Sequence, residues 1–178
     1  MKTTQILIAG FGGQGILFAG KFLAYKGLME DLQVSWLPSY GPEMRGGTAN
    51  CSVVLSDMPV GSPIITNPDV LVAMNLPSLQ KYVDTVAPGG QIYVDSALID
   101  EKVTRTDVEV FYIPATQMAK DEGIASLANM IIMGCLLQNN PELSFEGTEA
   151  VVSKLVPPTK AALIELNMKA LTLGKEYK

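Results

Sequence analysis

The chain has 178 residues, of which 48% are hydrophobic and 17% are charged, and its formal net charge is −5. This length suffices for one domain with a full core, so we expect residues 1–178 to form a single domain. The acidic balance and the lack of a basic run argue against nucleic acid as a partner, because neutralising phosphates requires clustered Lys and Arg.

An apolar run near the start of the chain leads into glycines in the order GxGxxG, at Gly10, Gly12 and Gly15. The pattern predicts a strand over residues 5–9 that turns tightly into a helix over residues 14–28. Free N–H groups at a helix N-terminus attract anions, and glycine lets a phosphate approach the backbone. We therefore predict a phosphate-binding turn. The alternative is that the glycines serve only a tight turn and close helix–sheet packing.

The second predicted strand, residues 33–37, bears on which ligand such a turn would take. A dinucleotide fold of the usual kind carries Asp or Glu at the end of this strand, about 20 residues beyond the glycines, to hold the ribose hydroxyl. Here the strand runs into Pro38, and the first carboxylate after it is Glu43. The sequence therefore lacks the main feature that would support binding of a nicotinamide dinucleotide.

Residues 39–48 concentrate three glycines, a proline, Glu43 and Arg45 at the expected carboxyl end of the second strand. Open α/β sheets bind ligands at that edge. The planar guanidinium of Arg45 is a candidate partner for a phosphate or a carboxylate. Pairing of Arg45 with Glu43, which would only shape the loop, is an equal alternative.

The rest of the chain alternates apolar runs with amphipathic stretches, the pattern of a sheet covered by helices. Asn75, directly after a buried strand, either reaches into the ligand crevice or caps the turn before Pro77. Ser144 and Thr159 are the predicted N-caps of the last two helices. The predicted fold class is α/β, with a three-layer, Rossmann-like, mostly parallel sheet flanked by helices and a helical C-terminal part. Further strands are predicted over residues 48–56, 69–74, 91–94 and 108–113, and further helices over 77–86, 115–121, 124–138, 144–155 and 160–173.

The predicted helix over residues 124–138 is apolar on most sides, which indicates burial. Its most apolar window, residues 124–137, contains Asn129 and Gly134 and is too short to cross a bilayer. Because no signal-peptide layout precedes the first strand, we expect a cytoplasmic protein without a membrane partner. Asn129 needs a hydrogen-bond partner if it is buried, which favours a structural role.

Histidine is absent, and the two cysteines, Cys51 and Cys135, lie far apart in apolar runs. The absence of histidine excludes a Ser-His-Asp triad and histidine-ligated metals. Two isolated thiols cannot hold an iron–sulfur cluster or a thiolate zinc site within the chain. We therefore predict no catalytic residue and no metal site, and we expect both cysteines to be buried, reduced thiols.

Four short blocks of sequence are distinctive as a set. They are GFGGQG at residues 10–15 followed by Ala19-Gly20, YGPEMRGG at residues 40–47, DVLVAMN at residues 69–75 and ANM at residues 128–130. With these blocks, which span most of the chain, the sequence resembles the gamma subunit, or gamma domain, of the 2-oxoacid:ferredoxin oxidoreductases.

This resemblance implies a complex that oxidatively decarboxylates a 2-oxoacid, forms an acyl-coenzyme A and reduces ferredoxin. It implies partner alpha and beta subunits, with or without a delta subunit, that carry the thiamine diphosphate and the iron–sulfur clusters. The present chain would help to bind coenzyme A and to pack the assembly, and would be inactive alone. Among the 2-oxoacids, 2-oxoglutarate is slightly favoured.

Coenzyme A is rich in phosphates, so the resemblance and the glycine pattern point to the same surface. Two other hypotheses stay open: a stand-alone nucleotide- or coenzyme A-binding regulatory module, and an independent nicotinamide dehydrogenase, which the missing ribose carboxylate and histidine disfavour. The predicted cofactor-binding residues are Gly10, Gly12, Gly13, Gln14, Gly15, Arg45 and Asn75.

Overall fold

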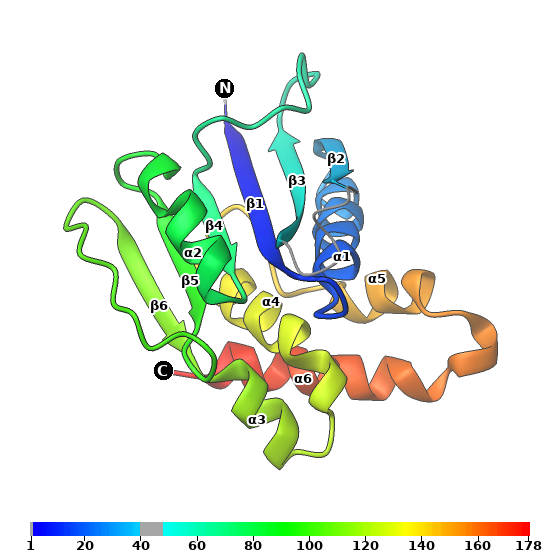
Figure 1. Ribbon diagram of the computed structural model, residues 1–178. Helices are drawn as coiled ribbons and strands as arrows, with labels where there is room; N and C mark the ends of the chain where they lie inside the picture. Colours follow the sequence, from blue (N-terminus) through cyan, green and yellow to red (C-terminus); the bar gives the residue numbers. More distant parts are fainter. Residues whose placement is uncertain (1, 40–47) are drawn as a thin grey trace.

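The computed structural model describes residues 2–39 and 48–178. Within these residues, six strands form one mixed sheet in the order β2-β3-β1-β4-β5-β6 (Figure 1). β1, β4, β5 and β6 run parallel, whereas β3 is antiparallel to both of its neighbours, β1 and β2. The strands are β1 (Thr3–Phe11), β2 (Gln33–Ser39), β3 (Thr48–Ser56), β4 (Val70–Ala73), β5 (Gln91–Asp95) and β6 (Glu109–Ile113).

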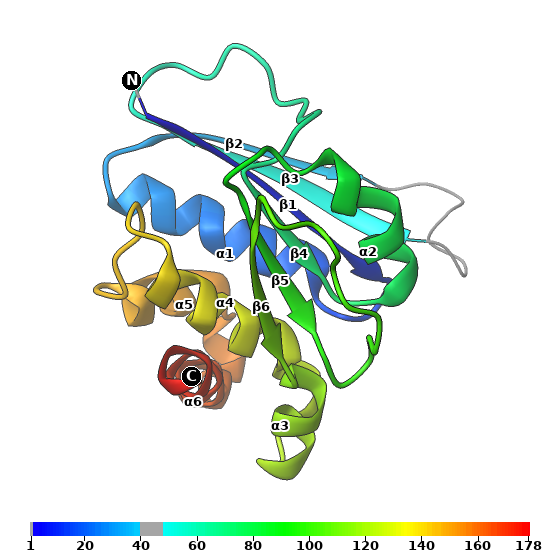
Figure 2. The same cartoon turned by 90° about the vertical axis from the view of Figure 1, so that its left-hand side faces the viewer.

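Helices cover the two faces of the sheet unequally. Figure 2 shows α1, α4, α5 and α6 on one side of the sheet and α2 on the other. This arrangement confirms the predicted three-layer α/β fold with a helical C-terminal part. The helices are α1 (Ile16–Met29), α2 (Leu76–Tyr82), α3 (Ala115–Asp121), α4 (Ala128–Asn139), α5 (Thr148–Leu155) and α6 (Ala162–Glu176), with 3₁₀ turns η2 (Val83–Thr85), η3 (Ala125–Leu127) and η4 (Pro158–Lys160).

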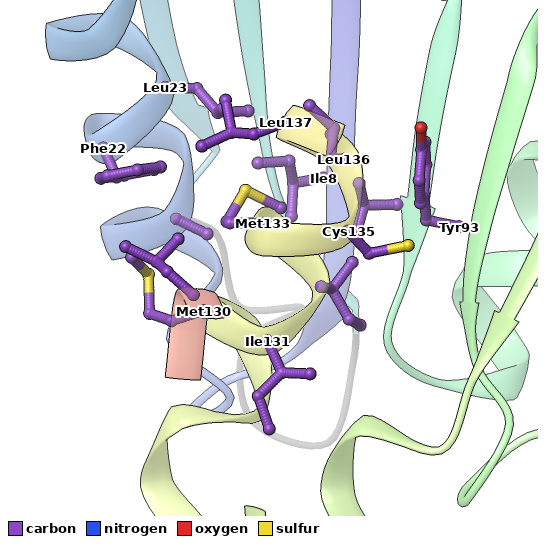
Figure 3. Packing of buried hydrophobic residues seen from close by; sticks show 14 of the residues in the cluster. Ile8, Phe22, Leu23, Tyr93, Met130, Ile131, Met133, Cys135, Leu136 and Leu137 are labelled. Atoms are coloured by element: carbon purple, nitrogen blue, oxygen red, sulfur yellow. The ribbon is translucent and has the colours of Figure 1, made fainter. Parts of the chain in front are cut away.

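The larger of two hydrophobic clusters lies on the face that α1 and α4 cover. Figure 3 shows side chains of α4, such as Leu137 and Cys135, between Leu23 of α1 and Tyr93 of β5. Because α4 is enclosed by α1, α6 and the sheet, all its residues from Ala128 to Leu137 are buried, which explains its uniformly apolar sequence. No helix in the described parts of the chain is long and apolar enough to span a membrane.

α4 and α6 cross at very short range. A Cβ added to Gly134 would collide with the backbone carbonyl of Leu171, and one added to Gly174 would collide with the carbonyl of Ile131. Each helix thus presents a glycine to the backbone of the other. The two glycines set the distance between the helices and fix α4 in the core.

The starts of the last two helices differ from the sequence prediction. α5 begins at Thr148, and its N-cap is Gly147 with a φ of 73°. The hydroxyl of Ser144 instead accepts a hydrogen bond from the Glu146 N–H at 2.9 Å, a local turn that competes with helix capping. Thr159 lies inside η4, and no side chain caps α6. The predicted caps at Ser144 and Thr159 are therefore wrong.

Candidate functional site

The carboxyl edge of the sheet contains a topological switch point between β1 and β4. These two strands are parallel neighbours, and the helices that follow them, α1 and α2, lie on opposite faces (Figures 1 and 2). In open α/β sheets, such a point is where ligands bind. The glycine loop, defined here as residues 11–15, begins at the last residue of β1 at this edge, and Asn75 follows β4.

The glycine loop adopts a backbone that favours glycine. Gly13 has a φ of 93° and Gly15 a φ of 72°, both in the region that residues with a Cβ rarely adopt. Gly15 is the N-cap of α1, and no side chain there accepts a hydrogen bond from the helix. Because the first N–H groups of a helix have no acceptor within the helix, the N-terminus of α1 is available to an anion.

A hollow of about 280 Å³ opens beside this loop. Nothing lies within 4 Å of the place that a Cβ on Gly13 would occupy. Its lining combines glycines with apolar side chains, so it suits a ligand that joins an anionic group to an apolar chain. The lining residues in the described part of the chain carry no charge: Phe11, Gly12, Gly13, Gly15, Ile16, Leu17, Phe18 and Ala49. A larger hollow of about 510 Å³ beside β6 and α6 lacks such a glycine backbone.

Gln14 braces the glycine loop with its side chain. Its Oε1 accepts a hydrogen bond from the Phe11 N–H at 2.6 Å, and its Nε2 donates to the Met74 carbonyl at 2.9 Å. Its backbone N–H donates to the Phe11 carbonyl at 3.3 Å. Gln14 thus ties the end of β1 to the end of β4, and the N–H that was expected to face a ligand already has a partner.

Gly10 lies inside β1 and is buried. A Cβ at this position would lie 2.5 Å from the Gln14 Oε1 and 2.7 Å from the Ile16 Cδ1. Gly10 therefore allows the loop and α1 to pack closely on the strand. Of the predicted glycines, Gly12, Gly13 and Gly15 line the hollow, and Gly10 lies beneath them.

Asn75 is the N-cap of α2. Its Oδ1 accepts a hydrogen bond from the Ser78 N–H at 2.8 Å, and its side chain is buried. The alternative that Asn75 caps the turn before Pro77 is thus confirmed. Its Nδ2 has no hydrogen-bond partner among the described residues. Arg45 and Glu43, in the second predicted binding loop, lie outside the described residues.

Asn129 reaches the glycine loop from α4. Its Nδ2 donates a hydrogen bond to the Gly15 carbonyl at 3.0 Å, and the residue is 2% exposed. The sequence predicted that a buried Asn129 needs a partner, and this partner is now identified. No local pattern links Asn129 to Gly15, because 114 residues separate them.

Asp95, at the end of β5, is a buried carboxylate that the sequence analysis missed. It ends an apolar strand at the carboxyl edge of the sheet, which is the signal that could have found it. Its oxygens accept hydrogen bonds from the Thr116 hydroxyl and N–H and from the Ala97 N–H. Through these contacts, Asp95 joins β5 to α3.

Both cysteines are free and buried, as predicted. Burial raises the pKa of the Cys51 thiol to about 12 and that of the Cys135 thiol to about 11. Neither thiol is therefore a thiolate near neutral pH, which is the form that acts as a nucleophile. Within residues 2–39 and 48–178, no group of three or more His, Cys, Asp or Glu residues is placed to hold a metal ion.

Similarity to known sequences identifies the family of this chain. The family model described as "Pyruvate ferredoxin/flavodoxin oxidoreductase" matches residues 5–177. The chain is 41% identical over 177 residues to the ketoisovalerate oxidoreductase subunit VorA of Methanothermobacter thermautotrophicus, covering 97% of this chain but 36% of that protein. It is 36% identical over 179 residues to the 2-oxoglutarate synthase subunit KorC of Methanothermobacter marburgensis, covering 97% of this chain and 95% of that protein. The chain thus spans about a third of the first relative and nearly all of the second.

Solved structures give the same result. A gamma subunit of a keto/oxoacid ferredoxin oxidoreductase from Geobacter sulfurreducens is 31% identical with a TM-score of 0.86, over 99% of this chain and 96% of that one. A 2-oxoglutarate:ferredoxin oxidoreductase from Magnetococcus marinus, with 2-oxoglutarate, coenzyme A and succinyl-CoA bound, is 26% identical with a TM-score of 0.86, over 98% of this chain and 31% of that one. The resemblance drawn from the four sequence blocks is confirmed: the chain belongs to the pyruvate ferredoxin/flavodoxin oxidoreductase family.

Proposed function

We propose that this chain is the gamma subunit of a cytoplasmic 2-oxoacid:ferredoxin oxidoreductase, in which it completes the assembly and helps to bind coenzyme A. Thiamine diphosphate and the iron–sulfur clusters belong to the alpha and beta partner subunits, with or without a delta subunit, and ferredoxin is reduced by the whole complex. The observation that carries this proposal is the open glycine loop at the N-terminus of α1.

The glycine loop fits coenzyme A in two ways. The uncapped N-terminus of α1 and the exposed backbone of Gly12 and Gly13 suit a phosphate. The partly exposed rings of Phe11 and Phe18 suit the apolar part of the pantetheine arm. Arg45 is proposed as the charged partner of a phosphate. The bound coenzyme A supplies the thiol that accepts the acyl group, while this chain only binds and orients it.

The role of a non-catalytic subunit agrees with the side chains at the site. Among the described residues, the lining of the hollow contains no titratable group, and the sequence contains no histidine. The similarity to KorC, a 2-oxoglutarate synthase subunit, and to the Geobacter gamma subunit supports a gamma-type role. We propose 2-oxoglutarate as the first substrate to test. A branched-chain 2-oxoacid is second, because VorA is also a close relative.

The test is to purify the tagged chain from its native host under anaerobic conditions and to follow viologen reduction by the eluate. Each 2-oxoacid is supplied with and without coenzyme A. We expect larger subunits to co-purify and activity to require one 2-oxoacid together with coenzyme A. A lone chain that is inactive with every 2-oxoacid would contradict the proposal and favour a stand-alone binding module.

The chain offers a matched pair for the role of Arg45. Arg45→Ala should raise the apparent KM for coenzyme A. Arg105→Ala, which removes the only other arginine, should leave it unchanged, because Arg105 pairs with Asp107 and with the carbonyls of Val83 and Val86. Lost assembly with an unchanged KM would instead assign Arg45 to a subunit interface.

A further inference from the structure

Asn129 is an unusual residue for its position. It lies in the first turn of α4, among residues that are otherwise apolar, and is 2% exposed. Only half of its amide is paired: Nδ2 donates to Gly15, whereas Oδ1 has no partner among the described residues. An apolar side chain would avoid the unpaired oxygen, so core packing alone does not account for an asparagine here.

Both residues determine the contact between Asn129 and Gly15. The Gly15 carbonyl accepts the first hydrogen bond of α1, from the Ala19 N–H at 3.0 Å, as well as the bond from Asn129. A Cβ on Gly15 would collide with the Asn129 amide. Glycine at position 15 therefore serves two requirements, a φ of 72° and the space that the amide occupies.

The glycine loop is held at two points, and the exposed part lies between them. Gln14 fixes the loop to the ends of β1 and β4, and Asn129 fixes the Gly15 carbonyl. Gly12 and Gly13, which face the hollow, are exposed. The support behind Asn129 is rigid, because α4 is locked against α6 at Gly134 and Gly174.

We propose that Asn129 is a positioning residue for ligand binding: by holding the Gly15 carbonyl, it orients the N-terminal N–H groups of α1 towards the hollow. This inference rests on the proposed function, namely that the glycine loop binds coenzyme A. Asn129 touches no ligand itself. Its hydrogen bond keeps the loop in the binding conformation before the ligand arrives, so the ordering cost of binding is reduced.

The test compares Asn129→Ala with Asn167→Ala in the assembled, purified complex. Asn167 is a matched control, because it is also 2% exposed, its Nδ2 donates to a backbone carbonyl (Leu163, 2.7 Å) and its Oδ1 is unpaired, yet it lies in α6. We expect Asn129→Ala to raise the apparent KM for coenzyme A about tenfold, the equivalent of one lost hydrogen bond. The KM for the 2-oxoacid and kcat should stay within about twofold, because the other substrate and the chemistry are not touched. Asn167→Ala should change none of these values.

Gly13→Ala separates this inference from the proposed function. It strains a backbone with a φ of 93° at the open part of the loop, and the added methyl group meets no other atom of the chain within 4 Å. If Gly13→Ala raises the KM for coenzyme A and Asn129→Ala does not, the loop binds the ligand and Asn129 has no positioning role. If neither variant changes this KM, the glycine loop does not bind coenzyme A as proposed, and Asn129 has no positioning role.

Hydrogen exchange in the full chain gives a second readout if Asn129→Ala does not assemble with its partners. We expect faster amide exchange over residues 10–17 in Asn129→Ala than in the unaltered chain, and no change there in Asn167→Ala. Equal exchange over residues 10–17 in the unaltered chain and in Asn129→Ala would overturn the inference, because the loop would then hold its conformation without this hydrogen bond.

Discussion

Glycines of the loop after β1 and glycines at the α4–α6 crossing perform opposite tasks. At Gly13, the space beside the backbone is open, with nothing within 4 Å of an added Cβ. At Gly134 and Gly174, the same space is filled by the backbone of the facing helix. Both places need glycine, but the loop needs it for a backbone conformation and an open approach, whereas the crossing needs it for packing.

A glycine pattern alone therefore does not identify a binding site. Gly10 belongs to the pattern GxGxxG, yet the side chains of Gln14, Ile16 and Met74 surround it. Gly15 combines both tasks, since it has a positive φ and faces the Asn129 amide. A glycine that admits a ligand needs open space beside its backbone, which Gly13 has and Gly10 lacks.

The largest effect is expected at the crossing. Gly174→Ala should destabilise the chain by about 3 kcal/mol, although alanine is the better helix former by about 1 kcal/mol, because rigid backbone occupies the space for the new methyl group. For a chain of this size, the melting temperature should fall by roughly 8 °C, as measured by circular dichroism.

Gly61→Ala is the control for this substitution, because Gly61 has a free space around it and no positive φ. It should change the free energy of unfolding by less than about 0.5 kcal/mol. Equal melting temperatures for the two variants would show that α4 and α6 separate easily. The filled space beside Gly174 would then make no greater contribution to stability than the open space beside Gly61.

An intermediate effect is expected at Gly15. Gly15→Ala should cost about 2 kcal/mol, of which roughly half comes from the positive φ and the rest from the collision with Asn129. Asn129→Ala removes the colliding amide, so the double variant should be about 1 kcal/mol more stable than the sum of the two single effects predicts. Urea unfolding of the four proteins measures this coupling. Strict additivity would mean that only the backbone conformation demands glycine at position 15.

The sequence predicted the fold well where structure is set locally. The glycine turn from β1 into α1 follows from residues that are adjacent in the chain, and the third strand was predicted with the observed bounds, Thr48–Ser56. Its antiparallel insertion between β1 and β2 was not predicted. A strand's direction and neighbours depend on pairing with distant segments, and its own residue pattern does not encode them.

The candidate site was predicted in part for the same reason. Gly13 and Gly15 have a positive φ, which restricts the residue type at one position, so the sequence could predict the turn that they form. The roles of Gln14 and Asn129 depend on hydrogen bonds to partners 60 and 114 residues away, Met74 and Gly15. Such contacts leave no periodic trace in the sequence, so the two amides that shape the loop could be found only in the folded chain.

The smallest effect is expected at Cys51, whose sulfur occupies the space beside another glycine. A Cβ on Gly20 would collide with the Cys51 Sγ, and the thiol donates a weak hydrogen bond to the Ile16 carbonyl at 3.4 Å. Burial raises the pKa of this thiol from 9.0 to about 12. The native chain at pH 8 should therefore not react with iodoacetamide at Cys51, whereas the urea-unfolded chain should.

The raised pKa also predicts a loss of stability at alkaline pH. Below about pH 9 the thiol is neutral in both the folded and the unfolded chain, so its contribution is intact. As the pH rises from about 9 towards about 12, only the unfolded chain ionises, which favours unfolding by up to about 1.4 kcal/mol per pH unit. Between pH 8 and pH 10, the unaltered chain should thus lose about 1 kcal/mol more than Cys51→Ala does, as measured by urea unfolding. An identical pH dependence in the two proteins would mean that water reaches the sulfur in the folded state, and that the space beside Gly20 is less tightly filled than the crossing of α4 and α6.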